Sequence, residues 1–268
     1  MKLKSKSLEK IFALKIAEKK FKNWYIFPLI YLKIYFHSFA NLITKNNIII
    51  KIRINSTDFF TFVNIWLLDE YFKNKINIQK NDIIIDIGGH IGLFALYASQ
   101  YCKNGKIYSF EPVIENYNLF LENIENNNLT NVKAFNTAVS KNEGEVNLFL
   151  NDDQAAHSIF TKSNTVKKVN STTLQKIFEK NKIENCNLLK IDCEGAEYEI
   201  LENLPIEYYK KIQKIVIECH FVETKKDVFE KLRVFLNKQN FKIDEKKLDN
   251  ELIILLGEKI DGGQNSRK

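Results

Sequence analysis

The sequence predicts an α/β domain built on a mostly parallel sheet, and two observations carry that prediction. From residue 81 onward, expected strands alternate with expected helices, as they do when helices cover both faces of a parallel sheet. The first strand runs through three isoleucines into Asp86 and then into a loop with glycines at positions 88, 89 and 92. Open α/β sheets bind ligands at such strand ends, where glycines let the backbone approach closely.

The expected strands are short apolar runs rich in β-branched residues. They occupy residues 83–87, 106–110, 132–137, 187–191 and 214–219, and residues 241–243 and 251–255 close the sheet as an antiparallel hairpin. The expected helices cover residues 93–102, 116–126, 174–180, a segment from about 195, and 227–237. Ser171 or Thr172 should cap the third helix. An inserted hairpin is expected from residues 145–150 and 166–169.

Residues 1–80 form an extension that we expect to be mainly helical, with one or two strands. Isoleucines alternate through residues 47–55, which predicts a strand with one buried face, and a helix follows at residues 61–72. Residues 8–44 mix lysines with apolar and aromatic residues, and their densest apolar part, Trp24 to Phe36, is too short and interrupted for a membrane span. We expect either a basic amphipathic helix on an anionic membrane, involving residues 1–44, or helices packed on the domain, which we favour. The domain itself should cover residues 81–258, and the tail, 259–268, should be disordered.

Charge is unevenly distributed along the chain. The first 50 residues contain ten lysines and two glutamates, a net charge of +8, whereas the whole chain carries +7. The predicted domain is therefore close to neutral, which argues against a nucleic-acid partner. The four cysteines lack disulfide or zinc spacing, which indicates a reducing compartment. We expect a cytoplasmic protein, at most peripheral at the inner membrane face.

The spacing of the glycine loop excludes two phosphate-binding motifs. A dinucleotide fingerprint that starts at Gly88 needs glycines at positions 90 and 93, which hold His90 and Leu93. A Walker A loop fails because no Gly-Lys-Ser/Thr follows. The remaining pattern, from Asp86 to Gly92, resembles motif I of class I S-adenosylmethionine (SAM) methyltransferases. The charge of Asp86 suits a ligand that carries an ammonium group.

Acidic residues end three further strands of the predicted sheet. Glu111 ends the second strand, where a carboxylate accepts hydrogen bonds from ribose hydroxyls in SAM and NAD alike. A denser cluster follows the fourth and fifth strands and consists of Asp192, Glu194, Glu197, Glu218 and His220. So many ionisable groups are costly in a sheet unless they face a cleft.

Taken in order, these motifs resemble the FkbM-type SAM-dependent methyltransferases over about residues 80–256. The resemblance rests on Asp86-Ile87-Gly88-Gly89-His90-Ile91-Gly92, Phe110-Glu111-Pro112, Asn136-Thr137-Ala138-Val139-Ser140, Thr173-Leu174, Lys190-Ile191-Asp192-Cys193-Glu194-Gly195-Ala196-Glu197 and Ile217-Glu218-Cys219-His220. It implies a seven-stranded Rossmann-like class I sheet, SAM as methyl donor, and usually O-methylation of a hydroxyl on a glycan, glycolipid or related metabolite.

The resemblance also implies cofactor-binding residues. These are Asp86, Gly88, Gly89 and Gly92 around the methionine, Glu111 at the ribose, Ala138 beside the adenine, and Glu194 and Glu197 in the acidic signature. His90 departs from the family pattern, in which small or polar residues such as Asn are common. It could hydrogen-bond the donor or cap the following helix.

An acceptor hydroxyl needs a general base, and we expect His220 in that role, oriented by Glu218 or Asp192. His157, beside Ser158, is a second candidate base or a substrate contact. We expect no metal, because Asp192 and Glu218 alone do not define a site.

Two other functions compete with methyl transfer. The first is a nicotinamide-dependent sugar oxidoreductase, which should have the dinucleotide glycine spacing and usually a Tyr-x-x-x-Lys pair. Tyr117 and Tyr198 are not followed by a lysine four positions on. The second is an inactive SAM-fold scaffold, against which the presence of Asp86, Glu111 and the acidic cluster argues.

Overall fold

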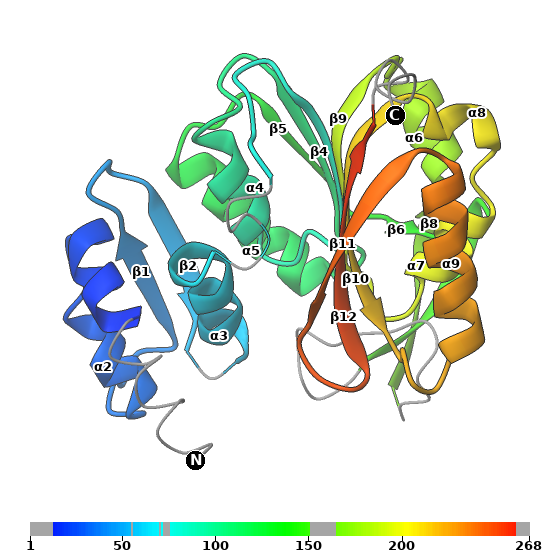
Figure 1. Cartoon of the computed structure of the whole chain (residues 1–268). Helices are drawn as coiled ribbons and strands as arrows, with labels where there is room; N and C mark the ends of the chain where they lie inside the picture. The colour runs from blue at the N-terminus through cyan, green and yellow to red at the C-terminus, as the bar shows by residue number, and fades with distance from the viewer. Residues whose placement is uncertain (1–12, 55, 70, 72–75, 151–164, 261–268) are drawn as a thin grey trace, which may run out of the picture.

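A computed structural model of the chain describes residues 13–54, 56–69, 71, 76–150 and 165–260. Its centre is a sheet of seven strands (Figure 1). In spatial order the strands are β11 (Phe241–Lys247), β12 (Leu252–Lys259), β10 (Ile212–His220), β9 (Cys186–Ile191), β3 (Ile83–Ile87), β4 (Lys106–Phe110) and β5 (Val132–Phe135).

The sheet is parallel except for one strand. β12 runs antiparallel to both of its neighbours, β10 and β11, while the pairs from β10 to β5 are all parallel. From β3 the chain proceeds outward through β4 to β5, then returns to β9 on the other side of β3. Ligands bind in open α/β sheets at such a point of reversal, beyond the carboxyl ends of the strands. The mostly parallel seven-stranded fold is therefore confirmed.

Helices cover both faces of this sheet because successive strand residues point to opposite sides. Ile84 packs in the layer of α4 (Leu93–Ser99) and α5 (Ile114–Asn126). Ile85 packs in the opposite layer, which includes α6 (Leu174–Lys180), α7 (Glu197–Glu202) and α9 (Lys226–Lys238). The short helix α8 (Ile206–Tyr209) places Tyr209 in this second layer.

The inserted hairpin forms as expected but belongs to a second sheet. β7 (Gly144–Leu150) pairs antiparallel with β8 (Thr165–Thr172), and β6 (Ala138–Val139) joins β8 as a parallel third strand. Because β8 continues to Thr172, neither Ser171 nor Thr172 caps α6. The cap is Thr173, whose hydroxyl accepts a hydrogen bond from the Lys176 N–H. The strand expected to reach residue 137 ends at Phe135.

The N-terminal extension combines helices with a two-stranded sheet. Residues 13–20 are helical and α2 (Ile26–Tyr31) follows. β1 (Phe39–Ile43) and β2 (Ile49–Arg53) pair antiparallel. The helix expected from residue 61 begins earlier, as α3 (Asp58–Phe62), and continues as the π-helix η1 (Val63–Leu67). Among the described residues, no helix combines the length and the apolar character required to cross a bilayer.

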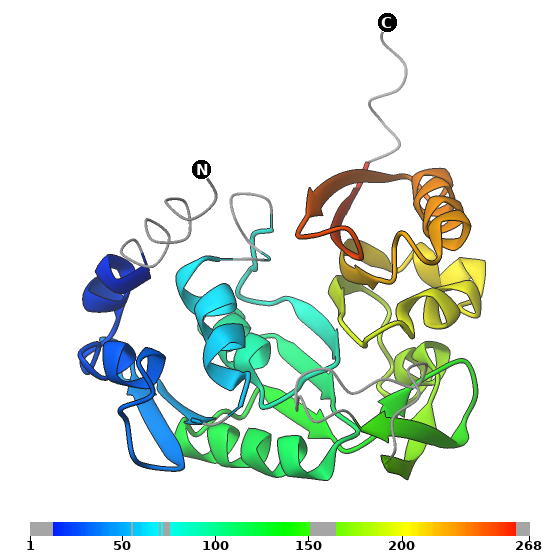
Figure 2. The ribbon, with the colours of Figure 1, turned by 90° about the horizontal axis from the view of Figure 1, so that it is seen from below.

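The extension packs on the face of the sheet that α4 and α5 cover. Leu42 and Ile50 share one apolar core with Phe94 of α4. Side-chain amides on α5 add polar contacts: Asn127 accepts from the Ile49 N–H and donates to the Ile49 carbonyl, and Asn123 does the same for Lys51. Figure 2 shows this extension at the opposite end of the molecule from β11, β12 and α9.

Two further expectations concern the tail and the cysteines. β12 continues to Lys259, so the ordered chain runs past the expected boundary at residue 258, and residues 261–268 lie outside the described part. All four cysteines are free thiols.

Candidate active site

A pocket of about 220 Å³ lies at the carboxyl ends of β3, β4, β9 and β10. The main sheet contributes Gly88, Glu111, Asp192 and Glu218 to its wall. The second sheet contributes Ala138, Val139 and Leu148, and the N-terminal extension contributes Thr61, Asn64, Ile65 and Tyr71. The pocket is thus closed by three parts of the chain that are distant in sequence.

The glycine loop lies directly against the end of β9. Gly88 has φ +82°, and a Cβ there would come within 1.7 Å of the Asp192 carbonyl oxygen. The N–H groups of Gly88 and Gly89 both donate to the Phe110 carbonyl, at 3.0 and 2.9 Å. Gly92 begins α4 with φ +85°, and a Cβ there would collide with the Phe120 ring. Side chains at these positions would push the loop away from the sheet.

Asp86 is fully buried behind this loop and does not line the pocket. The Ser109 hydroxyl donates to it at 2.6 Å, and the Lys190 ammonium lies 3.1 Å from its other oxygen. Lys190 also donates to the Gly88 carbonyl at 2.9 Å. Burial lowers the pKa of Lys190, but Asp86 and Asp192 raise it further, above its ordinary value. Lys190 therefore balances the charge of Asp86, and the contact with a ligand expected of Asp86 stays a prediction.

Glu111 defines one end of the pocket, which we call the ribose end after the role expected of Glu111 from the sequence. Its carboxylate accepts from the His90 N–H at 2.8 Å and from the Val113 N–H at 2.9 Å. Burial raises the pKa of Glu111 to about 7, although these two hydrogen bonds act in the opposite direction. Backbone N–H groups therefore fix the position of the Glu111 carboxylate in the wall of the pocket.

His90 connects this end to the N-terminal extension. It has φ 50°, and its Nε2 lies 3.3 Å from both Asp58 Oδ1 and Arg53 Nη2. Arg53 grips Asp58 through two nitrogens, at 2.9 and 2.8 Å. Burial lowers the pKa of His90 to about 4, against the opposing effect of Asp58. His90 is neutral at pH 7, and its buried Nδ1 has no hydrogen-bond partner among the described residues.

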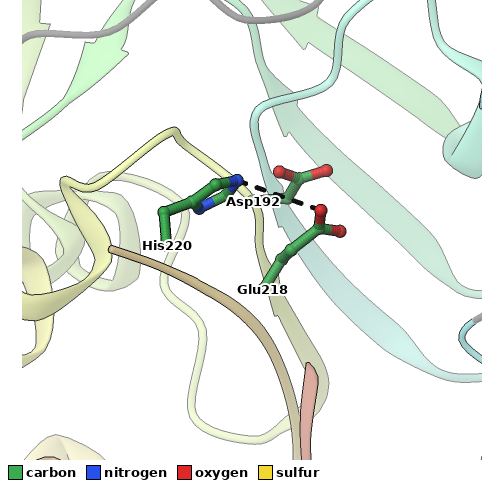
Figure 3. A group of neighbouring side chains, drawn as sticks. All are labelled: Asp192, Glu218 and His220. Atoms are coloured by element: carbon green, nitrogen blue, oxygen red, sulfur yellow. Dashed lines mark ion pairs between the residues drawn. The ribbon is translucent and has the colours of Figure 1, made fainter. Parts of the chain in front are cut away.

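Asp192 and Glu218 define the opposite end of the pocket, which we call the acid end (Figure 3). The Tyr71 hydroxyl lies 3.1 Å from Asp192 Oδ2 and 3.0 Å from Glu218 Oε2, so it bridges the two carboxylates. Within the described chain, Asp192, Glu218 and His220 are the one group with metal-ligand chemistry, with ligand atoms within 4.8 Å of one another.

His220 stands beside these acids but does not line the pocket. Its Nε2 lies 3.4 Å from Glu194 and 3.9 Å from Glu218, and its Nδ1 lies 3.4 Å from Glu197. Burial lowers the pKa of His220, but Glu197 and Glu194 raise it more, to about 10. At neutral pH the imidazole therefore already carries the proton that a base would have to accept. A protonated imidazole is not free to accept a further proton, and the role of general base expected of His220 stays a prediction.

The other two acids of the cluster differ in position. Glu194 lines the pocket, with φ 54°, whereas Glu197 is fully buried. Glu197 accepts from the backbone N–H groups of His220, at 2.7 Å, and Gly195, at 2.8 Å. Its place is thus structural, joining the turn after β9 to the end of β10. His157 and Ser158, the expected substrate contacts, lie outside the described residues.

Several residues of the site were not predicted from the sequence, namely Arg53, Asp58, Tyr71, Asn116 and Lys190. Lys190 had a signal, because a lysine inside the apolar run of β9 requires a buried partner. Arg53 and Tyr71 had none that distinguishes them from surface residues, because their partners lie far away in sequence. Asn116 connects the N-terminal extension to the main sheet, since its side chain accepts a hydrogen bond from Arg53 at 2.8 Å and donates one to Glu111 at 3.4 Å.

The strand order, with a glycine loop after the central strand, defines a class I methyltransferase fold. The structure is similar to that of the methyltransferase FkbM from Methylobacillus flagellatus, with a TM-score of 0.51 and 14% identity over 74% of this chain and 53% of that chain. Residues 86–243 match the model of the methyltransferase FkbM domain. The chain therefore belongs to the FkbM methyltransferase family.

Two curated relatives support this assignment. Methyltransferase 1 from Beauveria bassiana is 25% identical in an alignment of 180 residues that covers 56% of this chain and 72% of the relative. The hexuronic acid methyltransferase AglP from Haloferax volcanii is 24% identical over 153 residues, which is 56% of this chain and 61% of the relative.

Proposed function

We propose that the chain is a SAM-dependent methyltransferase that methylates a hydroxyl oxygen on a glycan, glycolipid or related metabolite. The observation that carries this proposal is the layout of the pocket. A glycine loop and a ribose-type carboxylate lie at one end, and two carboxylates bridged by a tyrosine lie at the other.

The residues of the pocket fit SAM. Gly88 lines the pocket and, without a Cβ, lets the loop pack against the end of β9, and Glu111 presents a carboxylate suited to a ribose diol. Phe110, Ala138 and Val139 give the same region an apolar wall that suits an adenine ring. When bound, SAM supplies an electrophilic methyl group on a sulfonium sulfur.

The acid end suits removal of a hydroxyl proton. Asp192 or Glu218 would take the proton of the acceptor hydroxyl, while bound SAM would supply the methyl group to that oxygen and leave as S-adenosylhomocysteine. A positioned base of this kind contributes roughly 10²- to 10⁴-fold in rate. Tyr71 holds the two carboxylates in place through its hydroxyl group.

The choice of an oxygen acceptor on a sugar rests on the family resemblance and on the name of one relative, which describes a hexuronic acid methyltransferase. A methyl-transfer assay with labelled SAM and cell-envelope extracts tests it, with methylated glycan or glycolipid as the expected product.

Calorimetry tests the cofactor directly, with S-adenosylhomocysteine and NAD as separate ligands. We expect the first to bind and the second not to. Gly88→Ala should abolish binding because its Cβ would meet the Asp192 carbonyl. Gly144→Ala is the matched control: Gly144 also has a positive φ, +118°, but a Cβ there meets nothing within 4 Å. Binding of NAD without S-adenosylhomocysteine would overturn the proposal in favour of an oxidoreductase.

A further inference from the structure

Large apolar side chains are exposed together on the N-terminal extension. Phe36 is 94% exposed, Leu32 61% and Phe60 60%. We call the following set the N-terminal apolar surface: Leu29, Tyr31, Leu32, Ile34, Phe36 and Phe60. Tyr31, Leu32 and Phe60 of this set lie together along one groove, and exposed apolar surface of this kind marks an interaction site.

A groove of about 460 Å³ continues this surface into the protein. All of its lining residues are apolar, and they come from the first helix, α2, α3 and η1. Tyr31, Leu32 and Phe60 belong to both the groove and the exposed surface. The groove therefore offers depth as well as area to an apolar ligand.

Lysines accompany the apolar residues. Between residues 13 and 50 the chain carries six lysines and a single acid, Glu18. Lys33 is exposed and lies between Leu32 and Ile34 in the sequence, so the chain carries a positive charge between two members of the apolar surface. Apolar side chains among lysines match the acyl boundary and headgroups of an anionic membrane. A second copy of this chain would present the same positive charge and is disfavoured for that reason.

The groove and the pocket share one wall. Phe60, Val63 and Leu67 of α3 and η1 line the groove, whereas Thr61, Asn64 and Ile65 of the same segment line the pocket. π-Helical turns such as η1 occur frequently at functional sites. A surface bound to the groove would therefore lie one helix thickness from the pocket.

We propose that the N-terminal apolar surface docks on an anionic lipid membrane. Its apolar side chains enter the acyl boundary and the lysines, Lys33 above all, pair with anionic headgroups. The proposal concerns binding alone and does not depend on methyl transfer.

Sedimentation with vesicles tests this docking. Full-length protein should sediment with vesicles of equal parts phosphatidylglycerol and phosphatidylcholine, and high salt should weaken that binding. Vesicles of phosphatidylcholine alone should bind far less. The double variant Leu32→Ser with Phe36→Ser should lower the partition coefficient by about tenfold or more. Lys33→Gln should lower it by about fivefold, as expected for one lysine near an anionic surface.

The control is Val228→Ser with Val234→Ser on α9, at the opposite end of the molecule, where both apolar side chains are also exposed, by 41% and 49%. It should bind vesicles as the wild type does, and all variants should keep the wild-type melting temperature. Protein that stays in the supernatant with anionic vesicles would overturn the proposal. So would a double variant that still binds fully. A concentration-dependent dimer that dissociates in the double variant, without vesicle binding, would assign this surface to a second copy instead.

Discussion

The two ends of the pocket each bury a histidine beside carboxylates, yet the histidines differ in charge. At the ribose end the pKa of His90 falls to about 4, and at the acid end the pKa of His220 rises to about 10. The distances to the nearest carboxylate oxygens are almost equal, 3.3 Å for His90 and 3.4 Å for His220. Proximity to an acid therefore does not explain the difference.

The difference lies in what else surrounds each acid. Arg53 holds both oxygens of Asp58 and also faces His90, so burial dominates there and the imidazole loses its proton. Two carboxylates, Glu194 and Glu197, flank His220 and together outweigh its burial. The charge of a buried histidine is set by the net charge of its surroundings, not by the presence of an acid. At pH 7 the contact between His90 Nε2 and Asp58 Oδ1 is thus not an ion pair, although the two atoms are only 3.3 Å apart.

The largest expected effect tests whether the acid end performs the chemistry. One of the two variants Asp192→Asn and Glu218→Gln removes the proposed base. That variant should lower the rate of methyl transfer by about 10²- to 10⁴-fold. His220→Gln should cost less than tenfold, because His220 does not touch the pocket. Rates come from labelled SAM and envelope extract, with affinity for S-adenosylhomocysteine as the control. A rate that falls most in His220→Gln would return the role of base to the histidine.

The second prediction tests whether Arg53 is the reason why the pKa of His90 is lowered at the ribose end. Arg53→Met leaves Asp58 buried without its cation and should lower the free energy of unfolding by about 3–5 kcal/mol. The pKa of His90 should rise above 4, because Asp58 then acts on it unopposed. Denaturant unfolding gives the first quantity and an NMR titration of the imidazole gives the second. Arg53→Lys keeps the charge and should change both less; an unchanged pKa in Arg53→Met would refute our account of His90.

The third prediction uses pH, since the two histidines should affect stability in opposite windows. An unfolded histidine titrates near 6.5. The stability that His220 contributes is complete below pH 6.5 and is lost as the pH rises toward 10. His90, with its lowered pKa, instead costs stability as the pH falls from 6.5 toward 4.

Unfolding curves that compare the wild type with His220→Gln and His90→Gln isolate each contribution from the rest of the chain. Between pH 7 and 9 the wild type should lose up to about 2–3 kcal/mol relative to His220→Gln. Between pH 6.5 and 4.5 it should lose a similar amount relative to His90→Gln. Parallel curves would show that neither histidine is perturbed as described.

The smallest expected effect concerns Glu111. Glu111→Gln should weaken the binding of S-adenosylhomocysteine by about tenfold, the scale of a hydrogen bond to a charged group. Because the pKa of Glu111 is raised to about 7, wild-type affinity should also fall between pH 8 and pH 6, and the variant should lack that dependence. Calorimetry at the two pH values measures both, with Glu122→Gln, an exposed acid of α5, as control. Equal affinity in Glu111→Gln would remove the carboxylate from the cofactor site.

Local patterns were enough to predict the main sheet. β3 and β4 occupy the residues expected of them, because apolar runs bounded by polar turns leave little choice of ends. β6 was missed because two residues carry no periodicity. The cap of α6 was misplaced by one residue. β8 extends through Thr172, so Thr173 is the first threonine outside the strand and becomes the cap.

The site was less predictable than the fold because its contacts span large distances in sequence. Acids at strand ends indicated where the pocket lies, and Glu111, Asp192 and Glu218 do line it. Tyr71 reaches Asp192 across 121 positions, and no local pattern encodes that pairing. The sign of the pKa shift at His220 likewise depends on where two carboxylates point after folding.

The asparagines that bind strand backbones have a consequence for solubility. Open strand edges invite pairing with other chains. Asn123 and Asn127 occupy the outer edge of β2, and Asn23 engages β1 in the same way, through the Ile43 N–H and the Asn41 carbonyl. The two-stranded sheet of β1 and β2 would otherwise expose edges at which other chains could pair. Side-chain amides cover those edges with the hydrogen bonds that a neighbouring strand would make. In a chain so rich in asparagine, some of that abundance protects the protein against aggregation.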